Sequence, residues 1–85
     1  MNDRETAFGK FNLLQKDLAK LFVQFSSHRE SLNKIIGGYK IETDFASMDL
    51  EEADSLIDSM KEVQAKIKTA ERELNYYKNT YGFEE

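Results

Sequence analysis

Residues 11–35, FNLLQKDLAKLFVQFSSHRESLNKI, decide the fold of this chain. Apolar residues recur in this stretch at alternating steps of three and four positions, and only one member of the series, a histidine, is polar. The series consists of Phe11, Leu14, Leu18, Leu21, Phe25, His28, Leu32 and Ile35. Such a heptad series places an apolar stripe along one side of a helix, and the stripe is buried when it faces another helix.

A second heptad series follows in the C-terminal half of the chain. It consists of Ala53, Leu56, Met60, Val63, Ile67, Ala70, Leu74, Tyr77 and Tyr81. We predict helices over about 6–36 and 48–80, with a loop over about 37–47 between them. If the two stripes pack antiparallel, residues whose numbers add up to 88 lie opposite each other, as Leu14 and Leu74 do. The sequence predicts an all-α fold, a single domain over residues 1–85 that forms an antiparallel, coiled-coil-like hairpin of two helices.

Glycine and acidic residues mark where the helices end and begin. Gly37 and Gly38 are expected to end helix one, because glycine takes the left-handed conformation without strain. Asp49 with Glu52 resembles a capping box at the start of helix two, and Gly82 is the expected cap at its end. We expect residues 1–5 to fray, with helix one beginning near Asp3 or Thr6.

One edge of the predicted hairpin is apolar near the loop end, and the other edge is polar. The apolar residues of the first edge lie at heptad e positions of both helices, and they are Phe8, Phe22, Ile36, Leu50 and Ile57. An apolar edge on a small protein is typical of an interface. We therefore expect these residues to bind a second copy or another protein and so to complete a four-helix bundle. The alternative is that loop residues Tyr39, Ile41 and Phe45 fold back and cover the edge within one chain.

Composition restricts the class of partner. The 85 residues include no cysteine and no proline, and the formal net charge is -4. Residues 1–40 carry seven basic and four acidic side chains, whereas residues 41–85 carry five and twelve, so the two halves attract each other. The acidic balance disfavours direct binding of nucleic acid, because phosphate contacts need a basic excess.

No membrane partner is expected. The longest apolar run, residues 21–23, is far shorter than the roughly 18 residues of a membrane span. The charged N-terminus is followed by no apolar segment typical of a signal peptide. We expect a cytoplasmic protein. Export by a route that needs no signal peptide stays an alternative.

The sequence places no catalytic, cofactor-binding or metal-binding residues together, so we expect no enzymatic activity and no cofactor. His28 is the single histidine, and we interpret it as a polar heptad residue that sets the helix register. Acidic residues cluster near the start of helix two, where the helix dipole favours them. They are Asp44, Asp49, Glu51, Glu52, Asp54 and Asp58. Because Glu51, Asp54 and Asp58 share a helix face, the alternative is a bound divalent cation. Tyr76, unlike Tyr77 and Tyr81, is expected to be exposed.

The small size, acidity, lack of cysteine and hairpin pattern resemble the WXG100 (ESAT-6-like) proteins exported by type VII systems of Gram-positive bacteria and mycobacteria. That family has Trp-x-Gly at the turn, where this chain has Ile36-Gly37-Gly38 without the tryptophan. Tyr81-Gly82-Phe83-Glu84-Glu85 fits the Tyr-x-x-x-Asp/Glu signal of some members. The resemblance implies a helical hairpin that is exported or that pairs with an exported helical partner.

The leading functional hypothesis is a non-enzymatic protein–protein interaction module. It would be a small structural or adaptor subunit, or an assembly chaperone, of phage or bacterial origin. One alternative is a secreted, WXG100-like helical effector or its partner. Another is an acidic, phage-type inhibitor of a nucleic-acid enzyme. The sequence leaves open whether the chain pairs with itself or with another protein.

Overall fold

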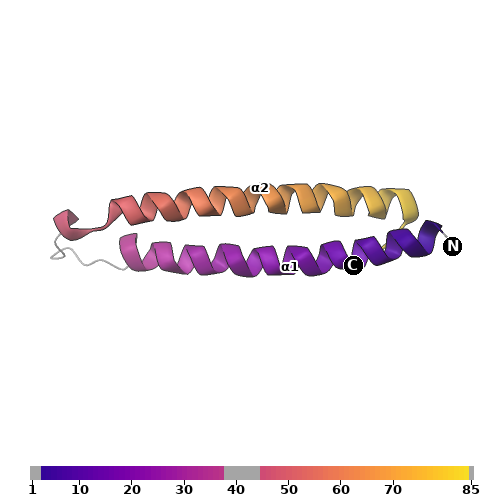
Figure 1. Cartoon of the computed structure of the whole chain (residues 1–85), viewed down its shortest axis with the longest axis horizontal. Helices are drawn as coiled ribbons and strands as arrows, with labels where there is room; N and C mark the ends of the chain where they lie inside the picture. Colours follow the sequence, from indigo (N-terminus) through magenta and orange to yellow (C-terminus); the bar gives the residue numbers. More distant parts are fainter. Residues whose placement is uncertain (1–2, 38–44, 85) are drawn as a thin grey trace.

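The computed structural model describes residues 3–37 and 45–84, and two long antiparallel helices account for most of them (Figure 1). α1 spans Asp3–Ile36 and α2 spans Leu50–Tyr81, and a short 3₁₀ helix, η1, covers Phe45–Ser47. The molecule is a rod with principal extents of 64 × 18 × 17 Å. The predicted all-α hairpin is confirmed, with α2 beginning two residues later and ending one residue later than expected.

The first turn of α1 packs onto the end of α2, and residues 3–5, for which the sequence predicts fraying, are helical. Nη1 of Arg4 donates a hydrogen bond of 2.6 Å to the carbonyl oxygen of Tyr81. The guanidinium of Arg4 also lies over the Phe83 ring, with its Cζ 5.0 Å from the ring centroid. Asp3 and Glu5 occupy the first turn, where the helix dipole favours negative charge.

Side-chain and backbone caps define both ends of α2. Oδ1 of Asp49 accepts a 2.9 Å hydrogen bond from the backbone N–H of Glu52, as the capping-box pattern predicts. At the other end Gly82 has a left-handed conformation, with φ of 71°, and its N–H donates to the carbonyl of Lys78 over 2.8 Å. This arrangement confirms Gly82 as the cap and turns the following residues back towards α1.

α1 ends at Ile36, as predicted, but not through a left-handed glycine. The N–H of Gly37 donates a 2.8 Å hydrogen bond to the carbonyl of Asn33, which continues the helical pattern. Among the described residues only Gly82 has a positive φ, so a left-handed cap at Gly37 is wrong, and Gly38 lies outside the described residues. A Cβ at Gly37 would lie 2.9 Å from the carbonyl oxygen of Asn33. Glycine is therefore required here by a close backbone approach.

The two heptad series form the contact between the helices, since every one of their members is buried or half-buried. One core cluster contains both members of three pairs whose numbers add up to 88. These pairs are Ala7 with Tyr81, Phe11 with Tyr77, and Leu14 with Leu74. The packing therefore supports the predicted register.

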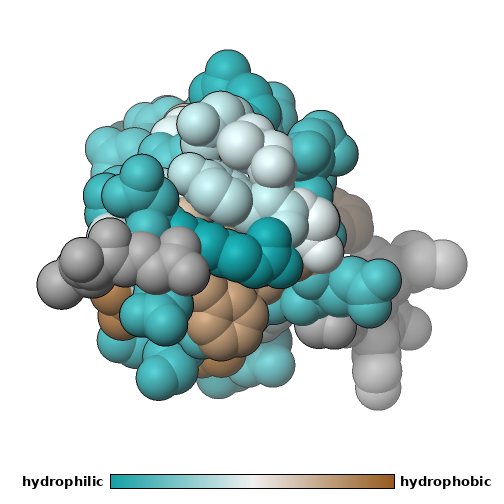
Figure 2. All heavy atoms as spheres, turned by 90° about the vertical axis from the view of Figure 1, so that its right-hand side faces the viewer, coloured by the Kyte–Doolittle hydropathy of each residue, from teal (hydrophilic) through white to brown (hydrophobic). Residues whose placement is uncertain are grey.

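Burial is concentrated where the chain ends meet. Ala7, Phe11, Leu74 and Phe83 form the buried cluster there, which we call the aromatic end, and Phe11 is fully buried. Figure 2 looks onto this end and shows hydrophilic side chains around a small patch of hydrophobic atoms. In the rest of the rod, the buried side chains among the described residues are only those of Ala53, Val63 and Ala70. The opposite end, where α1 stops at Ile36 and α2 starts at Leu50, we call the loop end.

Candidate interaction surface

All five predicted contact residues are exposed, and we call the edge that they form the apolar flank. The exposed fractions are 48% for Phe8, 49% for Phe22, 42% for Ile36, 60% for Leu50 and 38% for Ile57. These side chains occupy the heptad e positions, which lie beside the seam of an antiparallel pair and outside it. Two helices alone therefore leave them in water, as the structure shows.

The aromatic end of the flank is partly covered from within the chain. The Phe8 ring packs edge-on against Phe83, with 5.2 Å between ring centroids and an interplanar angle of 73°. Phe83 also contacts Phe11, at 5.2 Å between centroids, and stacks on Tyr81 at 5.3 Å and 11°. Within residues 3–37 and 45–84, Phe8 is thus the one member of the flank that packs against another aromatic ring.

Sequence reasoning missed Phe83, which has only 7% of its surface exposed. The signal was present, because an apolar residue directly after a glycine cap often packs back on its own helix. Val23 was missed as well. It is 69% exposed and lines a surface hollow together with Phe22 at the middle of the rod.

A shallow groove runs along the flank between the helices. Its lining consists of Phe22, Phe25, Ser26, Gln64, Ile67, Lys68 and Glu71, and its volume is about 430 Å³. Phe22, Phe25 and Ile67 supply apolar walls, while Lys68 and Glu71 contribute charges of both signs. An apolar floor with a charged border is typical of the centre and rim of a protein interface.

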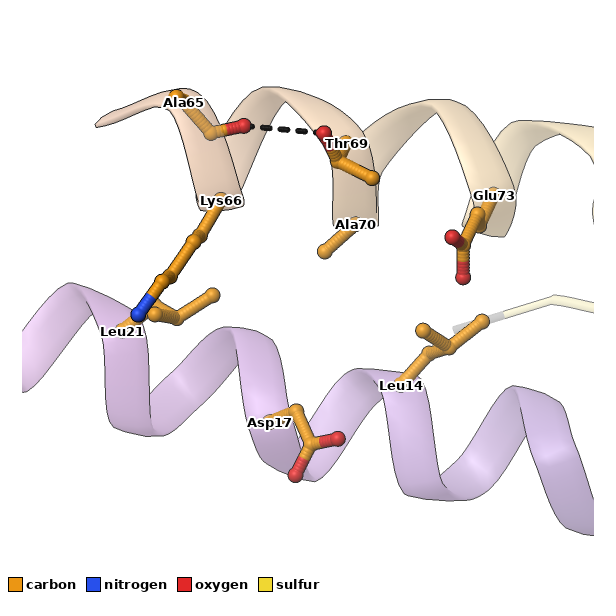
Figure 3. A pocket seen from close by; sticks show the side chains of 8 residues that line it. All are labelled: Leu14, Asp17, Leu21, Ala65, Lys66, Thr69, Ala70 and Glu73. Carbon is orange, nitrogen blue, oxygen red and sulfur yellow. Dashed lines mark hydrogen bonds between the residues drawn. The ribbon is translucent and has the colours of Figure 1, made fainter. Parts of the chain in front are cut away.

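The opposite edge of the hairpin has a groove of similar composition, with a volume of about 360 Å³ (Figure 3). Leu14 and Leu21 of α1 and Ala70 of α2 point into the space between the helices there. Asp17, Lys66 and Glu73 bring charged groups to the same groove. On α2 the small side chains of Ala65 and Thr69 border the groove. The hydroxyl of Thr69 donates a 3.1 Å hydrogen bond to the carbonyl of Ala65. The g-position side chains that border this groove, Asp17, Lys66 and Glu73, are polar, as the sequence predicts, whereas its floor is apolar.

The alternative in which loop residues cover the apolar flank is not supported at Phe45. This residue lies in η1 and is itself 60% exposed. Tyr39 and Ile41 lie outside the described residues, and so does Asp44 of the acidic cluster.

The remaining candidate residues do not converge on one site. His28 and Met60 are both half-buried in the seam, as expected for opposing heptad positions. Glu51, Asp54 and Asp58 are exposed, and residues 3–37 and 45–84 include no group of three or more His, Cys, Asp or Glu side chains that could hold a metal ion. The acidic side chains of the first turn of α2 lie where the helix dipole favours them.

The C-terminal tyrosines are placed as predicted. Tyr76 is 58% exposed, whereas Tyr77 and Tyr81 are half-buried and stack with 6.1 Å between ring centroids. Tyr81 and Phe83 of the Tyr-x-x-x-Asp/Glu pattern belong to the aromatic end, Glu84 is exposed, and Glu85 lies outside the described residues.

Neither described helix contains a segment that is both long and apolar enough to cross a bilayer. Compared with models of known protein families, with curated proteins and with solved structures, the chain matches none of them. The resemblance to the WXG100 proteins therefore rests on the motifs quoted above.

Proposed function

We propose that the chain is a non-enzymatic protein-interaction module, a small structural or adaptor subunit that binds a protein partner through the apolar flank. The observation that carries the proposal is the exposure of Phe22, which leaves half of its surface in water beside the more exposed Val23. Exposed aromatic and aliphatic side chains that lie together favour association, because covering them removes apolar area from water.

The shape of the hairpin supports the same function. Two helices supply one layer, and packing of a second layer onto the flank would bury Phe22, Ile36, Leu50 and Ile57 as a bundle core. The charged rim of the groove at Phe22 would then lie at the edge of the contact. The exported-effector and acidic-inhibitor hypotheses stay predictions from the sequence.

Site-specific photo-crosslinking in the cells that make the chain tests this proposal. A photoreactive phenylalanine analogue is placed at position 22, and the matched control carries it at position 13, where Leu13 is 60% exposed away from the flank. We expect a protein adduct from position 22 and little or none from position 13. Equal adducts at both positions, or none at position 22, would overturn the proposal.

A further inference from the structure

We propose that the apolar flank binds a second copy of this chain, docked antiparallel about a two-fold axis at the level of Phe22. This inference rests on the proposed function, because it names the partner of the same surface. It follows from the pattern of residues along α1 and, independently, from the charges along α2.

The flank of α1 is symmetric about Phe22. Its e positions fall at residues 8, 15, 22, 29 and 36, occupied by Phe8, Gln15, Phe22, Arg29 and Ile36. A perpendicular two-fold axis at Phe22 places Phe22 beside Phe22 of the second copy and Phe8 at the level of the second copy's Ile36. Gln15 then lies at the level of Arg29. A two-fold interface must be self-complementary, and this pattern pairs apolar with apolar and polar with polar.

The same axis matches opposite charges on α2. Residues of α1 and α2 lie at the same level along the rod when their numbers add up to 88, so the axis passes α2 at residue 66. Lys61 then reaches the level of Glu71 of the second copy, and Asp54 reaches the level of Lys78. All four are on the flank side of α2, at heptad positions b and e. Complementary charges at a rim favour one register and orientation over others.

The axis also brings the two unlike ends together. Leu50 of one copy comes to the level of Gly82 of the other, next to Phe83, so each aromatic end lies along an exposed loop end. A two-fold axis parallel to the rod would instead bring like ends of the two copies together. It would place Phe22 at about the level of Gln64 and Phe8 at about the level of Lys78, which sets aromatic rings against polar side chains.

Orientation is measured directly by attaching one spin label to each chain. The chain contains no cysteine, so Lys10→Cys provides a single labelling site, and Lys10 is exposed on the polar edge. In the antiparallel pair the two labels are offset along the rod by 24 positions, or about 36 Å at 1.5 Å per residue, and the measured distance must exceed that offset. In a parallel pair the labels lie at one level and are separated only across the thickness of the two rods, each 17–18 Å. Gln24→Cys is the matched site, because Gln24 is exposed on the same polar edge and lies close to the axis. The antiparallel pair gives a clearly longer distance for Lys10→Cys than for Gln24→Cys, whereas a parallel pair gives similar distances at both sites. Similar distances, or a wild-type chain that stays monomeric by light scattering at high micromolar concentration, would overturn the inference.

A charge exchange tests the register. Lys61→Glu and Glu71→Lys each turn two symmetry-related attractive pairs into repulsive pairs, so we expect each variant to raise the dimer Kd about threefold to tenfold. Mixing the two variants restores both pairs in a heterodimer, which should be tighter than either homodimer. Within one chain these residues are ten positions, or about 15 Å, apart, so the exchange creates no pair between them. No preference for the heterodimer would overturn the register.

The photo-crosslinking result separates this inference from the proposed function. An adduct at position 22 with twice the 9.9 kDa mass of the chain supports both proposals. An adduct with a different protein, formed while the purified chain remains monomeric, overturns self-pairing and leaves the interaction module standing.

Discussion

The two ends of the rod are built from the same heptad pattern and are buried to very different extents. At the aromatic end Phe11 and Leu74 have 0% and 2% of their surface exposed. Leu32 and Leu56 hold equivalent seam positions nearer the loop and are only half-buried. Away from the aromatic end the buried seam residues are the smaller ones, Ala53, Val63 and Ala70. The difference teaches that two helices fully cover a leucine or phenylalanine of the seam only where a third group closes it from the side.

Phe83 is that third group at the aromatic end. The left-handed Gly82 turns the chain after α2, and the Phe83 ring then contacts Phe8 and Phe11 on α1. The described residues at the loop end provide no equivalent cover, since Ile36, Phe45 and Leu50 are all exposed. The following predictions test this contrast.

The largest effect is expected from Leu74→Ala compared with Leu32→Ala, which make the same chemical change at equivalent heptad positions. Leu74→Ala should lower the free energy of unfolding by about 3 kcal/mol or more, because it leaves a cavity in a fully packed site. Leu32→Ala should lower it by roughly half as much, because its surroundings are already open to water. Urea unfolding followed by circular dichroism, at one low protein concentration, measures both. Equal losses would mean that the two ends do not differ in packing.

Removing the side cover should loosen the aromatic end selectively. Phe83→Ala deletes a buried ring and is expected to lower the free energy of unfolding by about 2 kcal/mol. Hydrogen exchange should accelerate in the second and third turns of α1, around Ala7 and Phe11, before it changes near Ala53. Tyr76→Ala is the control, because Tyr76 is exposed beside the same cluster and should leave exchange unaltered. Uniform acceleration along both helices would contradict a local role for Phe83.

The smallest effects come from two glycine substitutions with opposite expected signs. Gly82→Ala should destabilise the hairpin by about 1 kcal/mol, because alanine is strained at a φ of +71°. Gly9→Ala should stabilise it by up to about 1 kcal/mol, because Gly9 is helical and an added Cβ meets nothing within 4 Å. Thermal unfolding of the two variants beside the wild type gives both signs. A stable Gly82→Ala variant would show that the turn into Phe83 does not depend on glycine.

The sequence was sufficient to predict the helices, their register and the exposed flank, because each depends on a periodic pattern or on a local cap. The heptad series places Leu14 opposite Leu74, and the e positions place Phe22 outside the seam. Asp49 and Gly82 are recognisable as caps because their signals lie within four residues. Local chemistry of this kind can be read from sequence alone.

The contrast between the ends could not be predicted in the same way. It depends on Phe83 and Arg4, which contact residues far away in the chain. Phe83 follows the end of α2, where the backbone changes direction, so heptad spacing does not describe its contacts. Arg4 lies at a heptad a position, but its charged side chain did not indicate that the guanidinium packs over the Phe83 ring. The prediction of a left-handed cap at Gly37 is wrong because Gly37 stays in the helical hydrogen-bond pattern.

The position of the tightest packing has a consequence for the rate of folding. Phe11 and Leu74 are 63 positions apart in the chain, and Arg4 and Tyr81 are 77 apart. Ile35 and Ala53, by contrast, are separated by only 18. Bringing the aromatic end together first costs about 1 kcal/mol more closure entropy than starting near the loop, at roughly 0.6 kcal/mol per doubling of the loop. Starting near the loop gains little buried surface, so we expect this hairpin to fold more slowly than helical proteins whose best contacts are local.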